Sequence, residues 1–331
     1  MTAVTEISAI TATDSWRRRI GGWSADRFPP AMAVVGLPTF LAAHLLGQAS
    51  RGPSPVSVRL GGGAVAGWLA AVGFLLCVRI FDEHKDFDDD VRLHPERLVS
   101  RGVVRLRELD VMQAVVLVAI VGYCVWADGG VGPVTTTFGI AFAWLLAMRV
   151  EFFVGAWIRP RLVLYALTHA VVTPLASWWM FTSGAGRLVA APVLIPFLGA
   201  SYLSSLLFEF TRKLHAPEDE RADVATYSSE LGPARAARVV AVMVVLHALA
   251  MAAALVMVRG VDGADSAFVW GHALGWAAVV AASGLVAFAR RPDRAGHGPI
   301  EGLVALNLAV PAVSVIAVVL VGSSVKAVWG W

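Results

Sequence analysis

Residues 79–107 read RIFDEHKDFDDDVRLHPERLVSRGVVRLR, and they follow directly on an apolar run over residues 62–81. This stretch holds seven acidic and seven basic side chains. Asp82, Asp86 and Asp90 recur at every fourth position, so a helix continuing through them would carry their carboxylates along one face, roughly 6 Å apart per step. Like charges at that spacing repel each other unless a cation neutralises them. The stretch therefore predicts a cation-binding cluster at the end of a long apolar helix.

The composition is that of a membrane protein. Of the 331 residues, 57% are hydrophobic and 15% are charged, and the mean hydropathy is +0.69. These values are too apolar for an ordinary soluble domain and indicate a polytopic protein whose surroundings are the lipid bilayer. The formal net charge is only +3, and no tract of Arg and Lys is interleaved with aromatic residues. The sequence therefore offers no support for nucleic-acid binding.

Nine apolar runs reach the length of about twenty residues that a helix needs to cross a bilayer. The connections after the second and sixth runs are the longest, and they carry most of the acidic residues. We expect an all-α integral membrane protein with about nine transmembrane helices in a bundle around a central cavity, capped by two acidic cytoplasmic loops. The runs lie near residues 29–48, 62–81, 109–127, 131–150, 161–182, 187–208, 234–258, 266–289 and 302–323.

The positions of Lys and Arg predict the orientation, because cytoplasmic loops carry an excess of both. The even-numbered loops hold most of them, whereas the odd-numbered loops hold few. This bias favours a cytoplasmic N-terminus, an outside C-terminus and cytoplasmic acidic loops. The composition of the chain suits the bacterial cytoplasmic membrane. Residues 1–27 are polar, without an apolar core or a small-residue cleavage site, and are expected to be a cytoplasmic tail. A single transmembrane catalytic domain over residues 28–331 would follow, with motif loops at 82–108 and 209–233.

A second acidic cluster follows the sixth run. Residues 208–232 read FEFTRKLHAPEDERADVATYSSELG, in which Asp219 and Asp223 again stand four apart. The two clusters follow runs that are four runs apart, which indicates an internal repeat of four helices plus one extra helix.

Two such clusters facing one cavity suit a particular chemistry. Magnesium prefers oxygen ligands and is usually held by one or two carboxylates together with substrate phosphates. The clusters could thus hold two or more magnesium ions and bind a diphosphate as its metal complex, the ions stabilising the departing pyrophosphate. Nearby Arg and Lys would donate hydrogen bonds to the phosphate oxygens. The candidates for that contact are Arg97, Arg101, Arg212, Lys213 and Arg221.

With both clusters in place, the chain resembles the UbiA superfamily of intramembrane aromatic prenyltransferases over nearly its whole length. The family pattern after the second helix is Asn-Asp-x-x-Asp-x-x-x-Asp, and a second motif, Asp-x-x-x-Asp, follows the sixth helix. The resemblance implies a nine-helix bundle with a lateral opening to lipid, magnesium bound by both motifs, and ionisation of a prenyl diphosphate. It implies catalytic and metal-binding roles for Asp82, Asp86, Asp90, Asp219 and Asp223, with Glu83 as a further metal ligand.

Two departures from the family pattern leave the reaction open. Asp82 stands where the family has Asn, and Glu83 stands where it has Asp, so the metal cage gains negative charge and a longer arm. One reading is transfer of the prenyl group to a small or lipophilic acceptor, such as an aromatic compound. The alternative is a terpene cyclase of the same superfamily, which cyclises a diphosphate such as farnesyl or geranylgeranyl diphosphate without an acceptor. A transporter is disfavoured, because the centres of the apolar runs are nearly free of charge.

Polar and aromatic residues within or beside the apolar runs are candidates for the cavity wall. Glu151 could pair with an arginine or help to seat the substrate, and His169 could be a base, an acceptor-orienting group or a structural histidine. Aromatic rings could stabilise a carbocation, although Trp is also common in interfacial belts. Asn307 is expected to form a hydrogen bond between helices. The candidate cavity residues are Glu151, His169, Trp144, Trp178 and Phe208.

Overall fold

The computed structural model describes residues 7–51, 57–189, 192–221, 224–259, 276, 284–321 and 324–328. Seven helical segments in this part of the chain are long and apolar enough to cross a membrane. The expected all-α architecture with several membrane-spanning helices is therefore confirmed. In chain order these segments are α3 (Ala31–Ala49), α4 (Gly62–Lys85), α6 (Leu106–Asp128), α9 with α10 (Leu162–His169 and Val172–Ala185), α11 (Leu194–Arg212), α13 (Pro233–Arg259) and α16 with α17 (Arg294–His297 and Ile300–Val321).

Two of the nine expected runs are not among these seven segments. The fourth, at residues 131–150, is the seventeen-residue helix α7 (Pro133–Arg149). The eighth, at residues 266–289, lies mostly outside the described residues. Its last part contains the start of α15 (Val286–Arg290).

The fifth expected run is broken into two helices rather than continuous. Pro174, the third residue of α10, has no N–H to donate to the carbonyl of Ala170, and its ring would collide with that carbonyl in an unbroken helix. Helix α9 therefore ends at His169, and α10 starts at Val172. The two residues between the helices, Ala170 and Val171, keep helical φ and ψ angles, so the break is local.

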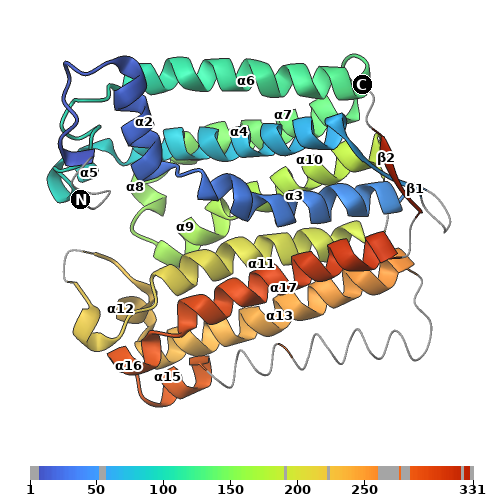
Figure 1. Ribbon diagram of the computed structural model, residues 1–331. Coiled ribbons are helices and arrows are strands. Elements are labelled where there is room, and N and C mark those ends of the chain that lie inside the picture. The colour runs from blue at the N-terminus through green and yellow to red at the C-terminus, as the bar shows by residue number, and fades with distance from the viewer. Residues whose placement is uncertain are drawn as a thin grey trace.

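Figure 1 shows the long helices side by side, with the short elements gathered at one end of the bundle. The segments that follow α4 and α11, which carry the two acidic motifs, both lie at this end. The opposite end holds a parallel pair of strands, β1 (Ser57–Gly61) and β2 (Ser324–Val328), with Ser57 opposite Ser324. The short elements at the motif end are α2 (Trp16–Arg27), α5 (Phe87–Leu93), η1 (Glu151–Phe153), α8 (Gly155–Ile158), η2 (Pro217–Asp219), α12 (Tyr227–Leu231), α15 and α16.

The apolar core has two main parts that match the two groups of helices in Figure 1. One is centred on α3, α4, α7 and α10 and includes Phe74, Phe138 and Trp179. The other lies among α9, α11, α13 and α17. Buried polar groups bond across helices in both. The Nδ2 of Asn307 lies 3.3 Å from the Nδ1 of His247 and donates to it, which confirms the expected interhelical hydrogen bond.

The segment expected to be an N-terminal tail contains helix α2, which packs on the bundle. Ile20 and Trp23 of α2 are buried in a third apolar cluster with Ile80 of α4, Leu98 of the motif loop and Leu109 of α6. The helix begins at an N-cap hydroxyl, since Ser15 accepts a hydrogen bond from the backbone N–H of Arg18. Helix α2 therefore covers the loop that carries the first motif.

Candidate functional site

The first motif straddles the end of α4. Asp82 lies in the last turn of α4, Asp86 directly follows the helix, and Asp90 lies in α5. The break between the two helices is slight, because the backbone N–H of Asp86 donates to the carbonyl of Asp82 at 2.9 Å and that of Asp90 to Asp86 at 2.8 Å. The four-residue helical spacing is thus kept through the whole motif. The side chains of Asp82 and Asp86 are 36% and 48% exposed, whereas that of Asp90 is only 14% exposed.

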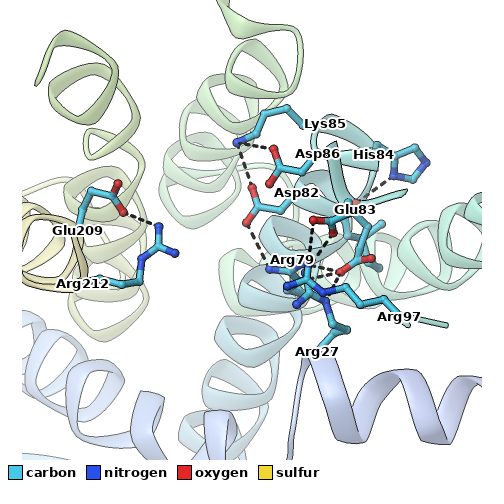
Figure 2. Close-up of polar contacts among 12 residues, drawn as sticks. Arg27, Arg79, Asp82, Glu83, His84, Lys85, Asp86, Arg97, Glu209 and Arg212 are labelled. Carbon is cyan, nitrogen blue, oxygen red and sulfur yellow. Dashed lines mark hydrogen bonds and ion pairs between the residues drawn. The ribbon is translucent and has the colours of Figure 1, made fainter. Parts of the chain in front are cut away.

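Cations surround these carboxylates (Figure 2). The Nζ of Lys85 lies 3.4 Å from an oxygen of Asp82 and 3.9 Å from an oxygen of Asp86. Asp90 is held more tightly, by the Nη1 of Arg97 at 2.5 Å and the Nη2 of Arg27 at 3.6 Å. Asp82 and Asp86 are therefore the accessible members of the motif, and Asp90 is engaged by two arginines.

The pKa of Asp86 lies above its ordinary value. Burial raises this pKa, the Lys85 ammonium opposes the effect, and the carboxylates of Asp82 and Asp90 raise the pKa further. A divalent cation beside Asp86 would act in the opposite direction and favour its ionised form. The motif therefore combines partly buried carboxylates with Lys85, Arg97 and Arg27 as their counter-ions.

Glu83 is buried, with 2% of its side chain exposed. Its Oε1 accepts hydrogen bonds from the Nε of Arg27 at 2.7 Å and from the Nη2 of Arg79 at 2.5 Å. Burying a carboxylate is costly unless it is paired, and here two guanidinium groups pair it. Figure 2 shows this cluster on the side of α4 that faces α2. The geometry assigns Glu83 to an ion-pair network that joins α2 to α4.

The second motif is described only in part. Asp219 ends η2 and accepts hydrogen bonds from both the Nε (2.8 Å) and the Nη2 of Arg294, at the start of α16. These bonds hold the pKa of Asp219 below its usual range. Asp223 lies outside the described residues. On α11, Glu209 pairs with Arg212 at 2.9 Å and with Lys213 at 2.7 Å.

The five cations expected to bind phosphate have contacts of other kinds. Arg97 is bound to Asp90, while Arg101 donates to the backbone carbonyls of Ser8 at 3.1 Å and Ile10 at 3.0 Å. Arg212 and Lys213 share Glu209, as above. Arg221 is exposed. A phosphate role for any of them stays a prediction, and it requires an exchange of partners when substrate binds.

Two of the candidate cavity residues, His169 and Trp144, belong to an aromatic cluster beside Lys85. The ring of His169 stacks on Tyr165 with centroids 3.8 Å apart, and Phe152 lies edge-on to His169 at 5.5 Å. Phe152 also packs against Trp144 at 5.2 Å. The Nζ of Lys85 lies 5.5 Å from the centre of the Tyr165 ring, so the aromatic cluster adjoins the first motif. Of the other three candidates, Glu151 is buried, Trp178 is half-buried and Phe208 is 65% exposed.

The hydrogen bonds of His169 define its tautomer. Its Nδ1 lies 2.8 Å from the carbonyl oxygen of Tyr165, and since a carbonyl can only accept, Nδ1 must carry the proton. The Nε2 atom of the neutral ring is then an acceptor. It is buried and has no hydrogen-bond partner among the described residues. The structure thus places a buried, unengaged imidazole nitrogen within the aromatic cluster.

A strained turn positions this cluster. Glu151, Phe152 and Phe153 have φ angles of 48°, 55° and 62°, in the left-handed region that costs a non-glycine residue about 1–2 kcal/mol. Glu151 is 4% exposed and accepts a hydrogen bond from the Nε of Arg159 at 2.5 Å, so it forms the arginine pair expected from sequence. The turn directs Phe152 onto Trp144 and His169.

Sequence reasoning missed three residues of this end of the bundle. Arg27 and Arg79 pair Glu83, and Tyr165 lies between Lys85 and His169. The position of Tyr165, four residues before His169, was the available signal, since that spacing stacks side chains on one helical face. No pattern in the sequence joins Arg27 to Glu83, which is 56 residues away.

The donor set fits magnesium without forming a complete cage. Within the described ranges no group of three or more His, Cys, Asp or Glu side chains converges closely enough to hold a metal ion. Magnesium does not require one, because it keeps several waters and takes its other ligands from substrate phosphates. The partly exposed oxygens of Asp82 and Asp86 are of the right type for that mode of binding.

Comparison with solved structures identifies the fold. The chain superposes on the apo structure of a UbiA homolog from Aeropyrum pernix K1 with a TM-score of 0.60, at 17% identity, covering 88% of this chain and 97% of that one. A digeranylgeranylglyceryl phosphate synthase gives 0.58 at 12% identity, covering 92% and 98%. A UbiA homolog from Archaeoglobus fulgidus bound to GPP and Mg²⁺ gives 0.51 at 15% identity, covering 89% and 99%.

No family model matches the sequence, and no curated protein matches it. The structural likeness, in contrast, extends over about nine-tenths of the chain and nearly all of each of the three structures. The resemblance indicated by the two acidic motifs is thus confirmed at the level of the fold. The chain has the UbiA fold, a membrane-embedded helical bundle.

Proposed function

We propose that the protein is a magnesium-dependent intramembrane prenyltransferase. It ionises a prenyl diphosphate, releases pyrophosphate and transfers the prenyl group to an aromatic or other lipophilic acceptor. The observation that carries the proposal is the pair Asp82 and Asp86, partly exposed and kept at helical spacing at the end of α4. The UbiA homolog from Archaeoglobus fulgidus, which has the same fold, binds GPP and Mg²⁺.

In this mechanism Asp82 and Asp86 are the principal metal ligands, and Asp90, Asp219 and Asp223 contribute from the rest of the two motifs. Bound magnesium would supply Lewis-acid stabilisation of the leaving pyrophosphate. The hydrogen bonds to the diphosphate oxygens would come from the five cations expected to bind phosphate: Arg97, Arg101, Arg212, Lys213 and Arg221. The bond between the allylic carbon and oxygen breaks, and its electron pair leaves with pyrophosphate. The acceptor then forms a bond to that carbon and loses a proton.

His169 offers a base for the proton loss that completes transfer. A prenylated acceptor must lose a proton, and the unengaged Nε2 of His169 is a base of the required kind in an otherwise apolar wall. The surrounding rings of Phe152, Trp144 and Tyr165 suit an allylic cation through cation–π attraction. The same rings would also serve a terpene cyclase, which is the second candidate.

Replacement of Asp86 or Asp219 by Ala tests diphosphate ionisation. Each change removes a carboxylate from one motif, and we expect magnesium-dependent pyrophosphate release to fall by about 100-fold or more. The assay uses purified protein in detergent with geranyl, farnesyl and geranylgeranyl diphosphates, each with a panel of aromatic acceptors. Asp89→Ala is the matched control, because Asp89 is 67% exposed and pairs only with Arg92 in the described part of the chain. Equal loss in the control, or none in the two test variants, would contradict the proposal.

Omission of the acceptor separates transfer from cyclisation. With a prenyl diphosphate and magnesium alone, we expect slow release of the uncyclised alcohol, because water is the only nucleophile present. Product analysis by gas chromatography with mass spectrometry reads out the fate of the prenyl chain. A cyclic hydrocarbon or cyclic alcohol made at the full rate would instead assign the protein to the terpene cyclases.

Glu83 is left out of the proposed metal set because two arginines pair it and only 2% of its side chain is exposed. Glu83→Gln should lower the free energy of unfolding by about 1–3 kcal/mol, since charge-assisted hydrogen bonds to Arg27 and Arg79 are lost. Its affinity for Mn²⁺, used as a spectroscopic substitute for Mg²⁺, should stay that of the native protein. Asp82→Asn is the companion variant and should show weaker Mn²⁺ binding at little cost in stability. The reverse pattern would make Glu83 a metal ligand.

We also propose that the motif end of the bundle faces the cytoplasm, in the bacterial cytoplasmic membrane. The excess of Lys and Arg in the even-numbered loops supports this orientation. Alkaline phosphatase, which is active only outside the cytoplasmic membrane, reports the location of a terminus to which it is fused. A fusion at the C-terminus should be active, and an inactive but expressed fusion would reverse the orientation.

A further inference from the structure

Lys85 occupies an unusual place in the first motif. It is the last residue of α4, and its side chain is only 15% exposed. Its ammonium group lies between the two accessible carboxylates, 3.4 Å from Asp82 and 3.9 Å from Asp86, as Figure 2 shows. On its other side is the face of the Tyr165 ring, at 5.5 Å. The ammonium group is therefore the cation nearest to both of the carboxylates that would hold a metal ion.

The other cations of the cluster are bound more firmly. Arg79 and Arg27 hold the buried Glu83 at 2.5 Å and 2.7 Å, and Arg97 holds Asp90 at 2.5 Å. Lys85, in contrast, has no carboxylate closer than 3.4 Å among the described residues. A metal ion that binds the carboxylates repels the positive charges beside them. The cation with the longest contacts to its carboxylates is the one that moves away most readily. Lys85 is thus the cation that a metal ion must displace.

A displaced ammonium group needs a new partner in this partly buried place. A diphosphate that arrives with the metal supplies several anionic oxygens next to Asp82 and Asp86. Lysine binds phosphate as a flexible point charge, and its four-carbon stem lets the group move while its backbone stays in α4. In the complex, Asp82 and Asp86 would bind the metal ion, and Lys85 would bind the diphosphate.

We propose that Lys85 is a diphosphate-binding residue that serves as the counter-ion of Asp82 and Asp86 in the free protein. Metal and diphosphate consequently bind cooperatively: the metal alone must expel the ammonium group, whereas the two ligands together provide it with an acceptor. The inference rests on the proposed function, because it takes a metal–diphosphate complex as the ligand of this site.

The test measures metal binding rather than turnover. Purified full-length protein in detergent is titrated with Mn²⁺, with and without inorganic pyrophosphate, and free Mn²⁺ is followed by electron paramagnetic resonance. The complex that the two form in solution is subtracted. For the native protein we expect pyrophosphate to tighten Mn²⁺ binding about tenfold, within the usual range for coupled sites. By reciprocity Mn²⁺ tightens pyrophosphate binding by the same factor.

Lys85→Met should alter both quantities in opposite directions. Mn²⁺ alone should bind several-fold more tightly, because the competing charge is gone, and the tenfold coupling should largely vanish. Lys85→Gln should change Mn²⁺ affinity and coupling in the same way as Lys85→Met, which excludes a packing defect caused by Met alone. Thermal unfolding verifies that each variant is folded. Lys85→Arg keeps the charge and should retain coupling. Arg92→Met removes a positive charge from α5, where it pairs with the exposed Asp89, and should match the native protein.

The outcomes separate this inference from the proposed function. If the native protein binds neither Mn²⁺ nor pyrophosphate, both fail. If it binds both ligands but Lys85→Met and Lys85→Gln leave affinity and coupling unchanged, the proposed function survives and the role of Lys85 is overturned. Weaker binding of Mn²⁺ alone in those variants would also overturn it, since a competing counter-ion cannot assist the metal.

Discussion

The concentration of negative charge at the end of α4 is the constraint on which this end of the molecule depends. A helix C-terminus carries a partial negative charge of its own, so Asp82, Glu83 and Asp86 stand where carboxylates are least favourable. Four cations from three segments neutralise this negative charge: Arg27 of α2, Arg79 and Lys85 of α4 itself, and Arg97 of the motif loop. Each cation neutralises a carboxylate, but the distances differ. Each arginine lies 2.5–2.7 Å from Glu83 or Asp90, whereas Lys85 lies 3.4 Å from Asp82 and 3.9 Å from Asp86. Those are the two side chains that a metal would need.

The same charge pattern explains why the polar N-terminal segment is packed rather than free. Helix α2 is fastened at its first turn by Arg19, whose guanidinium binds both oxygens of Glu108 at 2.6 Å and 2.8 Å. It is fastened at its last residue by Arg27, which binds the buried Glu83. Bidentate and buried charge pairs of this kind fix geometry as well as contributing energy. Trp23, with 1% exposure, fills the space between the two attachments. Helix α2 consequently limits how far the motif loop can move.

The features that could be predicted from the sequence were those set by local pattern and by length. Apolar runs of span length gave the long helices, and the spacing of Asp82, Asp86 and Asp90 gave a motif that keeps helical hydrogen bonds from end to end. Contacts between distant segments could not be predicted in this way. The pairing of β1 with β2 joins residues more than 260 positions apart, and Arg27 could be counted as a loop charge but not matched to Glu83. Pro174 accounts locally for the break between α9 and α10, whereas the contact of His169 with Phe152 depends on tertiary packing.

The three residues with left-handed backbone angles at Glu151–Phe153 link the first acidic motif to the aromatic cluster. Such a turn persists only where the surrounding structure holds it, and strained backbone of this kind concentrates at functional sites. Here the buried Glu151–Arg159 pair anchors it at one side and the Trp144–Phe152 contact at the other. Through Phe152 the turn sets His169, His169 stacks on Tyr165, and Tyr165 faces the ammonium group of Lys85. The motif that would hold the diphosphate and the aromatic wall that would receive the allylic cation therefore meet at one lysine. A movement of Lys85 on ligand binding would change its contacts with both Asp82 and the Tyr165 ring.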